Sequence, residues 1–434
     1  MNTTTRPCRL LGLCLVCAIA CDPSDGPAPD LSAPDLATPV DLGASADLLP
    51  ALVTLTVNAS GAGTVSAPAQ GLRCTATTCR VTVPAATQIT LSVQAEPKQQ
   101  FSGWGGQCSG GAGSCTLTLQ ADTTVSASFA PKTCAASDWC KENSGQTAAL
   151  YGVYAQGPRN VLAVGANGTV LHFDGGSWST VQSGTTATLR SVWFASATEA
   201  WMVGTQGTVL RYDAGVIRPV TSPVTSQLNG VSGASPSEIY MVGTGGVVLT
   251  YDGTALTPLN SGTNVDLLAT WVAASKNVFV STADSSQSVG LRVGYSLLSY
   301  DGATWQKLLR IPVKTSISMA GLHGTDPSNL WLAGDGSGTG PIAGGCLWYR
   351  GAALGSGVVG CSKLLAVWTA APTDTWMAGE GGVLKHWNGT AFDGQHPSYN
   401  IPSGTGAALQ GLHGTSSTNI WAVGQAGTIL HLEK

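Results

Sequence analysis

The apolar positions of the chain repeat with a regular period from residue 160 onward. Most repeats contain an apolar run that ends in glycine, a short polar turn with a second glycine, and another apolar run. In the first three repeats the glycines that end the first run, Gly165, Gly204 and Gly243, recur every 39 residues. Such self-similarity is typical of repeat folds. The seven copies read NVLAVGANGTVLHFDG from Asn160, EAWMVGTQGTVLRYDA from Glu199, EIYMVGTGGVVLTYDG from Glu238, NVFVSTADSS from Asn277, NLWLAGDGSG from Asn329, DTWMAGEGGVLKHWNG from Asp374 and NIWAVGQAGTILHLEK from Asn419.

Each repeat predicts four short antiparallel strands. In the third copy these strands cover residues 228–232, 239–242, 247–251 and the stretch after 255, where the sequence has no helical periodicity. The Gly-x-x-Gly step between the second and third strands predicts a tight turn with positive φ. Four strands of this kind form one blade of a β-propeller. We therefore predict an all-β chain with a seven-bladed β-propeller.

The last repeat lacks its fourth strand, because the sequence ends at Lys434 after only three. Residues 138–145 (DWCKENSG) align with residues 177–184 (SWSTVQSG), the fourth strand of the first copy. We expect the 138–145 segment to complete the last blade. This arrangement would close the ring without leaving an open sheet edge.

Residues 51–131 show a different pattern, the strict alternation of half-buried strands. It is clearest at 53–57, 87–93 and 123–129, which predicts a small β domain. Trp104 in this region has two interpretations, an exposed platform for a ligand or the main core residue. We favour the core, because one tryptophan buries about 200 Å² and the domain is small.

Two resemblances follow from these motifs. Residues 51–131 resemble the divergent internalin B-type bacterial repeat. The resemblance rests on the Gly-Trp-Gly-Gly-Gln-Cys motif at 103–108, the Cys-Thr-Leu-Thr-Leu motif at 115–119 and the upstream pair Cys74 and Cys79. That resemblance implies a spacer or adhesive module of a bacterial surface. The Trp-x-x-Gly and Tyr-Asp-Gly steps of the later repeats resemble propellers of the BNR and photosystem-assembly-factor type, which implies a fold and not a function.

The N-terminus has the features of an exported protein. Arg6 and Arg9 precede an apolar run at 10–20 that is too short to span a bilayer, and this predicts a signal peptide over 1–20. The run ends Ala-Ile-Ala-Cys, which resembles the lipobox of bacterial lipoproteins and implies lipidation of Cys21. The alternative is ordinary cleavage with Cys21 as a spare thiol. Residues 21–50 are rich in Pro, Asp and Ala, which predicts a disordered linker, and the propeller is expected over 132–434.

The cysteines support export to an oxidising compartment. Three of the twelve lie in the predicted signal peptide and one is Cys21, and the other eight fall into close pairs, which predicts structural disulfides. Their spacing does not fit a zinc site. The predicted pairs are Cys74 with Cys79, Cys108 with Cys115, Cys134 with Cys140, and Cys346 with Cys361.

Charge and motifs argue against several functions. Charged residues make up 10% of the chain, the formal net charge is −4, and no basic cluster occurs, so nucleic acid is not an expected partner. Residues 174–178 approach a sialidase Asp box but are one residue short, and no arginine triad is evident. We find no metal or cofactor motif. We expect no enzyme; the alternative is a carbohydrate-active hydrolase or lyase.

The histidines fall in repeated positions. His323 and His413 share one repeat position, which other copies fill with Tyr, Trp or Ser, and His172 and His431 share another, with His386 near it. We interpret both positions as packing positions. Carboxylates or a Tyr/His cluster converging at the channel mouth would instead favour the enzyme alternative, whereas a neutral Gly/Ser/Thr surface would favour binding.

The candidate ligand site lies in two long turns. The turn between the second and third strands is swollen in the fourth and fifth copies, at 284–295 and 335–345, and these turns would lie on one face of the propeller. Asp284, Arg292, Tyr295 and Asp335 are the predicted ligand contacts; the alternative is two tolerated surface insertions. The expected partner is an envelope protein or glycan, and the lipid anchor is expected to attach the protein to a membrane. We expect a monomer that lies on the periplasmic face of that membrane or on the cell surface.

Overall fold

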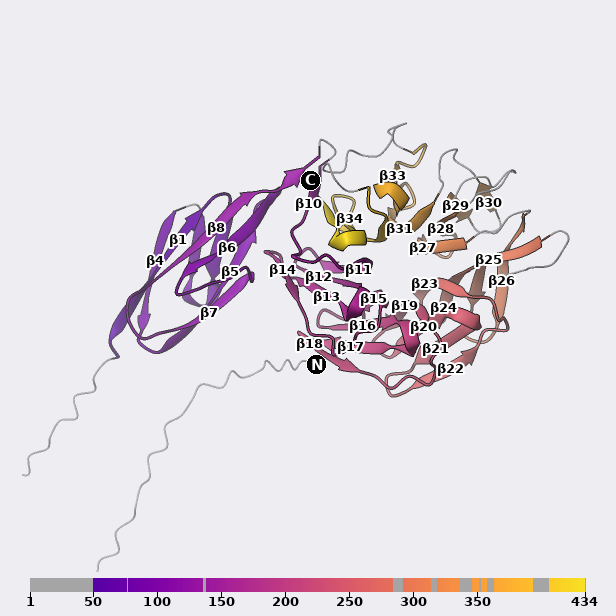
Figure 1. Cartoon of the computed structure of the whole chain (residues 1–434), viewed down its shortest axis with the longest axis horizontal. Helices are drawn as coiled ribbons and strands as arrows, with labels where there is room; N and C mark the ends of the chain where they lie inside the picture. Colours follow the sequence, from indigo (N-terminus) through magenta and orange to yellow (C-terminus); the bar gives the residue numbers. More distant parts are fainter. Residues whose placement is uncertain are drawn as a thin grey trace, which may run out of the picture. The chain divides into compact units, whose positions relative to one another are not determined.

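The computed structural model describes residues 50–75, 77–135, 138–283, 292–313, 318–335, 346–350, 353–356, 363–392 and 406–433. Over this part of the chain the regular structure consists of β-strands and single 3₁₀ turns, which confirms the all-β prediction (Figure 1). The predicted signal peptide, Cys21 and the predicted linker lie outside the described residues.

The first eight strands form a small β domain with two four-stranded sheets. The sheets have the orders β4-β1-β8-β6 and β3-β2-β5-β7, and strands of both contribute to one hydrophobic core. Trp104 is 8% exposed within that core, and its Nε1–H donates to the carbonyl oxygen of Ala112 at 2.8 Å, so the core interpretation of Trp104 is confirmed. The strands are β1 (Leu52–Ser60), β2 (Gly63–Ala67), β3 (Leu72–Thr75), β4 (Thr78–Pro84), β5 (Thr87–Ala95), β6 (Gln99–Gly106), β7 (Ser114–Leu119) and β8 (Thr123–Pro131).

Disulfides close the short segments of this region. Cys74–Cys79 links β3 to β4 and so joins the two sheets, while Cys108–Cys115 links the turn after β6 to β7. A third disulfide, Cys134–Cys140, lies at the start of the propeller. The pairing of Cys346 stays a prediction, because Cys361 lies outside the described residues.

Seven further sheets are the blades of the propeller. Blades 1 to 5 have the orders β11-β12-β13-β14, β15-β16-β17-β18, β19-β20-β21-β22, β23-β24-β25-β26 and β27-β28-β29-β30. Their strands are β11 (Leu150–Gly157), β12 (Asn160–Gly165), β13 (Val170–Phe173), β14 (Trp178–Thr180), β15 (Leu189–Phe194), β16 (Glu199–Gly204), β17 (Val209–Asp213), β18 (Val216–Pro219), β19 (Leu228–Ser235), β20 (Glu238–Gly243), β21 (Val247–Tyr251), β22 (Leu256–Asn260), β23 (Leu267–Ala274), β24 (Asn277–Thr282), β25 (Arg292–Tyr300), β26 (Trp305–Val313), β27 (Ser318–Asp326), β28 (Asn329–Asp335), β29 (Cys346–Arg350) and β30 (Ala353–Ser356).

Blades 6 and 7 complete the ring. Blade 6 has three described strands, β31-β32-β33, and blade 7 has the order β34-β35-β36-β10-β9. Each innermost strand contacts the innermost strand of the next blade, and β34 of blade 7 contacts β11 of blade 1. The strands are β9 (Thr133–Cys134), β10 (Trp139–Lys141), β31 (Leu364–Ala371), β32 (Asp374–Gly379), β33 (Leu384–Trp387), β34 (Leu409–Ser416), β35 (Asn419–Gly424) and β36 (Ile429–Glu433).

The outer part of blade 7 comes from the N-terminal side of the propeller. Strand β10 pairs antiparallel with β36, with Trp139 opposite Leu432, and β9 pairs with β10 on the outside. In blade 1, Trp178 lies opposite Phe173 in the corresponding pair of strands. Strand β10 covers three residues of the 138–145 segment, and β9 adds a fifth strand that the repeat pattern does not contain.

The turn between the second and third strands has the same conformation in five blades. In blade 2 it is the 3₁₀ turn η3 (Thr205–Gly207), where Gln206 and Gly207 have φ of 58° and 66°. A Cβ on Gly207 would collide with the carbonyl oxygen of Val224. Glycine is therefore required here by both conformation and space. The other turns of this kind are η2 (Ala166–Gly168), η4 (Thr244–Gly246), η5 (Glu380–Gly382) and η6 (Gln425–Gly427).

The hydrophobic cores of the propeller lie between blades. Trp421 and Ile429 of blade 7, for example, share one cluster with Leu171 and Trp178 of blade 1. This follows from the strand pattern, because both faces of a blade are apolar and each needs a neighbour to cover it. Closure of the ring therefore buries the two end blades against each other.

Candidate functional site

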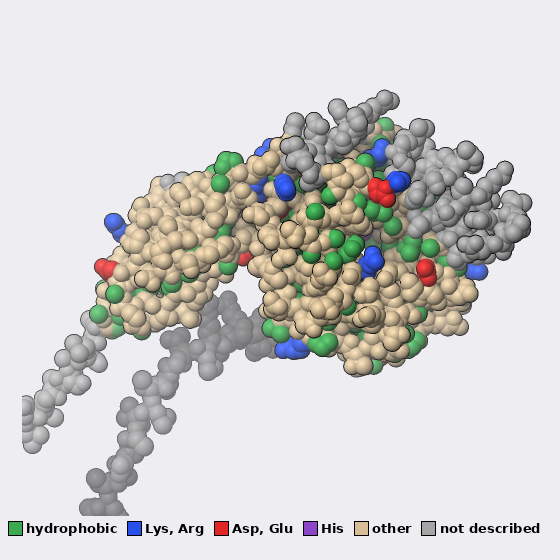
Figure 2. All heavy atoms as spheres, viewed as in Figure 1, with side chains coloured by type: hydrophobic (Ala, Val, Ile, Leu, Met, Phe, Trp, Pro, Cys, Tyr) green, Lys and Arg blue, Asp and Glu red, His purple; other side chains and the backbone are tan. Residues whose placement is uncertain are grey.

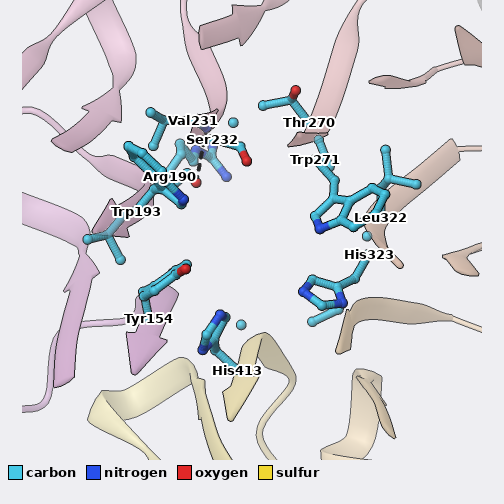
Figure 3. Close-up of a pocket in the computed structure, with 18 of the residues that line it drawn as sticks. Tyr154, Arg190, Trp193, Val231, Ser232, Thr270, Trp271, Leu322, His323 and His413 are labelled. Carbon is cyan, nitrogen blue, oxygen red and sulfur yellow. Dashed lines mark hydrogen bonds between the residues drawn. The ribbon is translucent and has the colours of Figure 1, made fainter. Parts of the chain in front are cut away.

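The seven innermost strands surround a cavity of about 530 Å³ on the axis of the propeller. Figure 3 shows Arg190 and Trp193 on one side of the opening, with Trp271 and His323 across it and Tyr154 and His413 below. A cavity of this size suits a small ligand or one chain segment.

A β-bulge near the start of every innermost strand shapes one end of the cavity. In β15, for instance, Leu189 pairs with Gly204 and Ser191 pairs with Val203, so Arg190 is an extra residue. An extra residue bends the strand and re-aims its side chain. The bulged residues, which we call the bulge ring, all line the cavity: Tyr151, Arg190, Asn229, Leu268, Ala320, Leu365 and Gln410.

Small residues follow the bulges and let the strands converge. A Cβ on Gly152 would lie 3.0 Å from the carbonyl oxygen of Arg190 on the neighbouring strand. Ser191, the equivalent residue of blade 2, instead accepts a hydrogen bond from the N–H of Val231 at 3.3 Å. This layer of the channel is thus formed by backbone and small side chains.

A second ring of side chains lies three residues further along each strand. We call it the aromatic ring, and it contains the repeat position of His323 and His413: Tyr154, Trp193, Ser232, Trp271, His323, Trp368 and His413. All except Trp368 line the cavity. Tyr154 stacks on His413 with ring centroids 3.8 Å apart, and His323 lies 5.9 Å from Trp271 and 6.3 Å from His413. The packing interpretation of this position was incomplete, because these side chains also form the channel wall.

The two histidines of the aromatic ring are neutral hydrogen-bond donors toward the channel. Nδ1 of His413 accepts from the N–H of Ala155 at 3.2 Å, and Nδ1 of His323 accepts from the N–H of Thr369 at 3.1 Å. An accepting Nδ1 places the proton on Nε2. Burial lowers the pKa of His323 to about 4, and burial together with His323 lowers the pKa of His413 well below its ordinary value.

Charge is nearly absent from the cavity wall. Among the described lining residues Arg190 carries the only formal charge, and none is Asp or Glu. Burial also raises the pKa of the Tyr154 hydroxyl, against the effect of its hydrogen bond with Trp193. The described wall therefore has hydrogen-bond donors, aromatic faces and one cation, but no acid and base pair. Figure 2 shows that charged side chains are also sparse on the described surface in view.

The predicted contacts of the long turns are placed only in part. Asp284 lies outside the described residues. The backbones of Arg292 and Tyr295 belong to β25, opposite Val313 and Arg310 of β26, so the last part of the predicted 284–295 turn is strand. Asp335 is the last residue of β28. The side chains of all four residues lie outside the described part, and their role stays a prediction.

The other histidines have structural partners. Nε2 of His172, His386 and His431 lies 3.0, 2.9 and 2.8 Å from a side-chain oxygen of Asn160, Asp374 and Asn419, each the first residue of a second strand. These contacts, together with the stacking of His431 on Trp421 at 3.4 Å, confirm the packing interpretation for this position.

A second polar cluster lies where the two ends of the propeller meet. Glu142, His431 and Glu433 have ligand atoms within 4.8 Å of one another, an arrangement that could hold a metal ion. Lys132 Nζ already lies 2.6 Å from Glu142 and 3.0 Å from Glu433, with Lys132 and Glu142 only 4% exposed. The ammonium therefore lies where a metal ion would bind. We call Lys132, Glu142, His431 and Glu433 the latch cluster. The hydrophobic pattern does not reveal this cluster, because its residues lie at opposite ends of the propeller sequence.

The fold and the channel define this protein as an all-β chain with a seven-bladed β-propeller. No family model and no curated protein matches it. Solved structures do match, each over 68% of this chain. They include YCF48 bound to D1 peptide (16% identity, TM-score 0.53, 95% of that chain), the extracellular domain of BT4673 from B. thetaiotaomicron (14%, 0.53, 39%) and streptogramin B lyase (11%, 0.55, 96%). At these identities the likeness shows the propeller fold alone.

Proposed function

We propose that this chain is an exported, lipid-anchored and non-enzymatic binding or scaffold protein of the bacterial cell envelope, which holds its partner at the propeller channel. The observation that carries this proposal is the described channel wall, which combines aromatic faces and N–H donors with a single cation and no carboxylate. Such a surface can hold a ligand, whereas acid–base catalysis needs a group that takes up a proton.

The histidines of the aromatic ring support binding more than catalysis. The Nδ1 lone pairs of His323 and His413 are already used by backbone N–H groups, and only Nε2–H groups remain. The lowered pKa of each ring keeps it neutral and makes it a weak base at pH 7. We therefore assign both rings as fixed donors to a bound ligand.

The envelope location rests mainly on the sequence. The predicted signal peptide, the lipobox-like step at Cys21 and the predicted linker together indicate export and anchoring. The three disulfides of the described region are typical of an oxidising compartment. Within the described residues, no helix has the length and hydropathy needed to cross a membrane. Among the similar structures, one is an extracellular domain and one holds a peptide, which fits an exported binding protein.

Two experiments test the two parts of the proposal. Cell fractionation of Cys21→Ser should move the protein out of the membrane fraction, and an unchanged fraction refutes the lipid anchor. For binding, the full chain is cross-linked in envelope extracts beside the Trp193→Ala and Trp271→Ala variants, with Arg218→Gln, an exposed change on β18, as the control. A partner held at the channel is lost from both tryptophan variants and kept by the control; equal capture by all of them refutes channel binding.

The Tyr154, His323 and His413 cluster favours a second candidate, a carbohydrate-active hydrolase or lyase. This candidate requires turnover of a glycan, with a rate that falls in both His323→Asn and His413→Asn. A panel of envelope glycans incubated with the full chain tests this candidate, and absence of products across the panel refutes it.

A further inference from the structure

Arg190 is the one charged residue of the described channel wall, and it has no charged partner. It follows Leu189 in β15 as the bulged residue, and its guanidinium carbon lies 4.8 Å from the centre of the Tyr151 ring. Its Nε is buried without a hydrogen-bond acceptor. Within the described residues, no carboxylate lies within ion-pair distance of Arg190.

Two other arginines of the described propeller donate to protein groups. The Nε of Arg211, like that of Arg190, has no acceptor, but its Nη2 donates to Glu199 at 3.1 Å, and Arg159 donates to the carbonyl oxygens of Asp174 and Val93. A partly buried guanidinium without such a partner is costly, because burial removes water that would otherwise solvate it. The arrangement at Arg190 therefore suits the binding of an anionic ligand.

The shape of the guanidinium selects the anion. Its planar fork of N–H donors matches a carboxylate in a two-point contact, and the guanidinium of Arg190 lies over the Tyr151 ring. A positive group in a low-dielectric channel without competing negative groups also attracts anions from a distance.

The aromatic ring defines the rest of the ligand. Residues of this ring lie three positions beyond the bulge ring, which is about 10 Å along a strand. The faces of Trp193, Trp271 and His323 surround the cavity at that level, and Nε2–H groups of the two histidines add donors. Flat apolar or aromatic groups pack well against such faces.

We propose that the channel binds an organic carboxylate, with its charged end on Arg190 and a flat apolar body against Trp193 and Trp271. This rests on the proposed binding function and names the chemistry of its ligand. The same chemistry occurs in a free aromatic acid and in the carboxyl end of a peptide with a C-terminal aromatic residue, and the two sources are separated by experiment.

The test titrates the full chain with phenylacetate and with N-acetyl-Gly-Phe, following tryptophan fluorescence and isothermal heat. Phenylacetamide and N-acetyl-Gly-Phe-amide are the uncharged controls. We expect both carboxylates, or the one from the true source, to bind at least about tenfold more tightly than the matched amide, since a hydrogen bond to a charged group has that effect. Equal binding of acid and amide, or binding of neither acid, overturns the proposal.

Variants then assign the effect to Arg190. Arg190→Gln should lose the preference for acid over amide, Arg190→Lys should keep part of it, and Arg218→Gln on the exposed strand β18 should not change it. Melting curves establish that each variant is folded, and Arg190→Lys keeps the test valid where Arg190→Gln does not fold. An acid preference that survives in both Arg190 variants overturns the assignment.

The outcome is distinguishable from failure of the proposed function. If Arg190→Gln still captures the envelope partner as wild type does, the carboxylate site is wrong while the binding function stands. If wild type itself captures nothing at the channel, the proposed function fails first.

Discussion

Removing one member of the latch cluster should open the propeller at much lower denaturant. Lys132 and Glu142 lie on the N-terminal side of the ring, whereas His431 and Glu433 belong to β36 at the C-terminal end. Lys132 pairs with both carboxylates, and Lys132 and Glu142 are 4% exposed. Changing Glu142 to Gln leaves this buried ammonium with one carboxylate instead of two, so the cost should lie below the ~3 to 5 kcal/mol of a buried charge that loses its only partner.

A double-mutant cycle separates this cost from simple loss of packing. Lys132→Met alone leaves two buried carboxylates near each other, with only His431 between them. In Lys132→Met with Glu142→Gln the buried ammonium and one of its two carboxylates are removed together, and Glu433 keeps its contact with His431 at 2.9 Å. We expect the double variant to lose about 1 to 3 kcal/mol less than the sum of the single variants.

Urea unfolding of the full chain, followed by tryptophan fluorescence, measures these differences. Glu380→Gln, which breaks the exposed pair with Lys363 (59% and 50% exposed), is the control and should change the free energy of unfolding by less than about 1 kcal/mol. Single latch variants that cost no more than this control, or a double variant equal to the sum, would refute the reasoning.

The same cluster gives the protein an acid limit. Burial by itself raises the pKa of Glu433, but hydrogen bonding and charge from His431, the Lys132 ammonium and the N–H of Lys98 together lower it to about 2, against an ordinary value of 4.5. Because the folded pKa is the lower one, the stabilisation is complete above about pH 4.5 and is lost as the pH falls toward 2. Glu433→Gln should flatten the pH dependence of the urea midpoint in that window, and an unchanged slope would contradict the assignment.

Three further changes test the architecture. Gly207→Ala should lower stability by about 1 to 3 kcal/mol more than Gly184→Ala, because both glycines have positive φ but only Gly207 faces a carbonyl oxygen; the difference in urea midpoints measures it. Cys134→Ser with Cys140→Ser should cost about 2 kcal/mol from the short loop that this disulfide closes, and thermal unfolding under non-reducing conditions checks it. Trp104→Ala should cost about 3 to 5 kcal/mol in the small β domain, seen as loss of its amide protection in hydrogen exchange while the propeller stays protected.

The propeller could be predicted because its blades are made by local contacts. Each hairpin pairs residues a few positions apart, so the Gly-x-x-Gly turn and the apolar runs specify a blade without distant information. The same period revealed the missing strand of the last repeat, and Trp139 and Trp178 now lie in corresponding strand pairs. The chemistry of the long turns at 284–295 and 335–345 could not be predicted in equal detail. Only their length suggested a site, and length does not say which side chains contact a ligand.

The channel was visible in the sequence only in part. His323 and His413 align with the other residues of the aromatic ring, and the packing interpretation of this position accounts for their ring contacts but not for their place in the channel wall. The signal that could have corrected this is the change of volume at one repeat position, from Trp193 to Ser232. A close-packed position does not tolerate such a change without a cavity. The bulge ring was missed because one extra residue per strand has no signature in a hydrophobic pattern.

Closure of the ring and binding in the channel are thermodynamically linked. Arg190 comes from blade 2 and His413 from blade 7, and blade 7 is complete only when β10 pairs with β36. A ligand that contacts both of these blades therefore binds the closed ring more tightly than the opened one. At a concentration about 100 times its Kd it should stabilise the closed ring by about 2.7 kcal/mol. An acid that binds at Arg190 should raise the urea midpoint of wild type and of Glu142→Gln by similar amounts, and its amide should not; a midpoint that does not respond to saturating acid would show that the acid binds away from the channel.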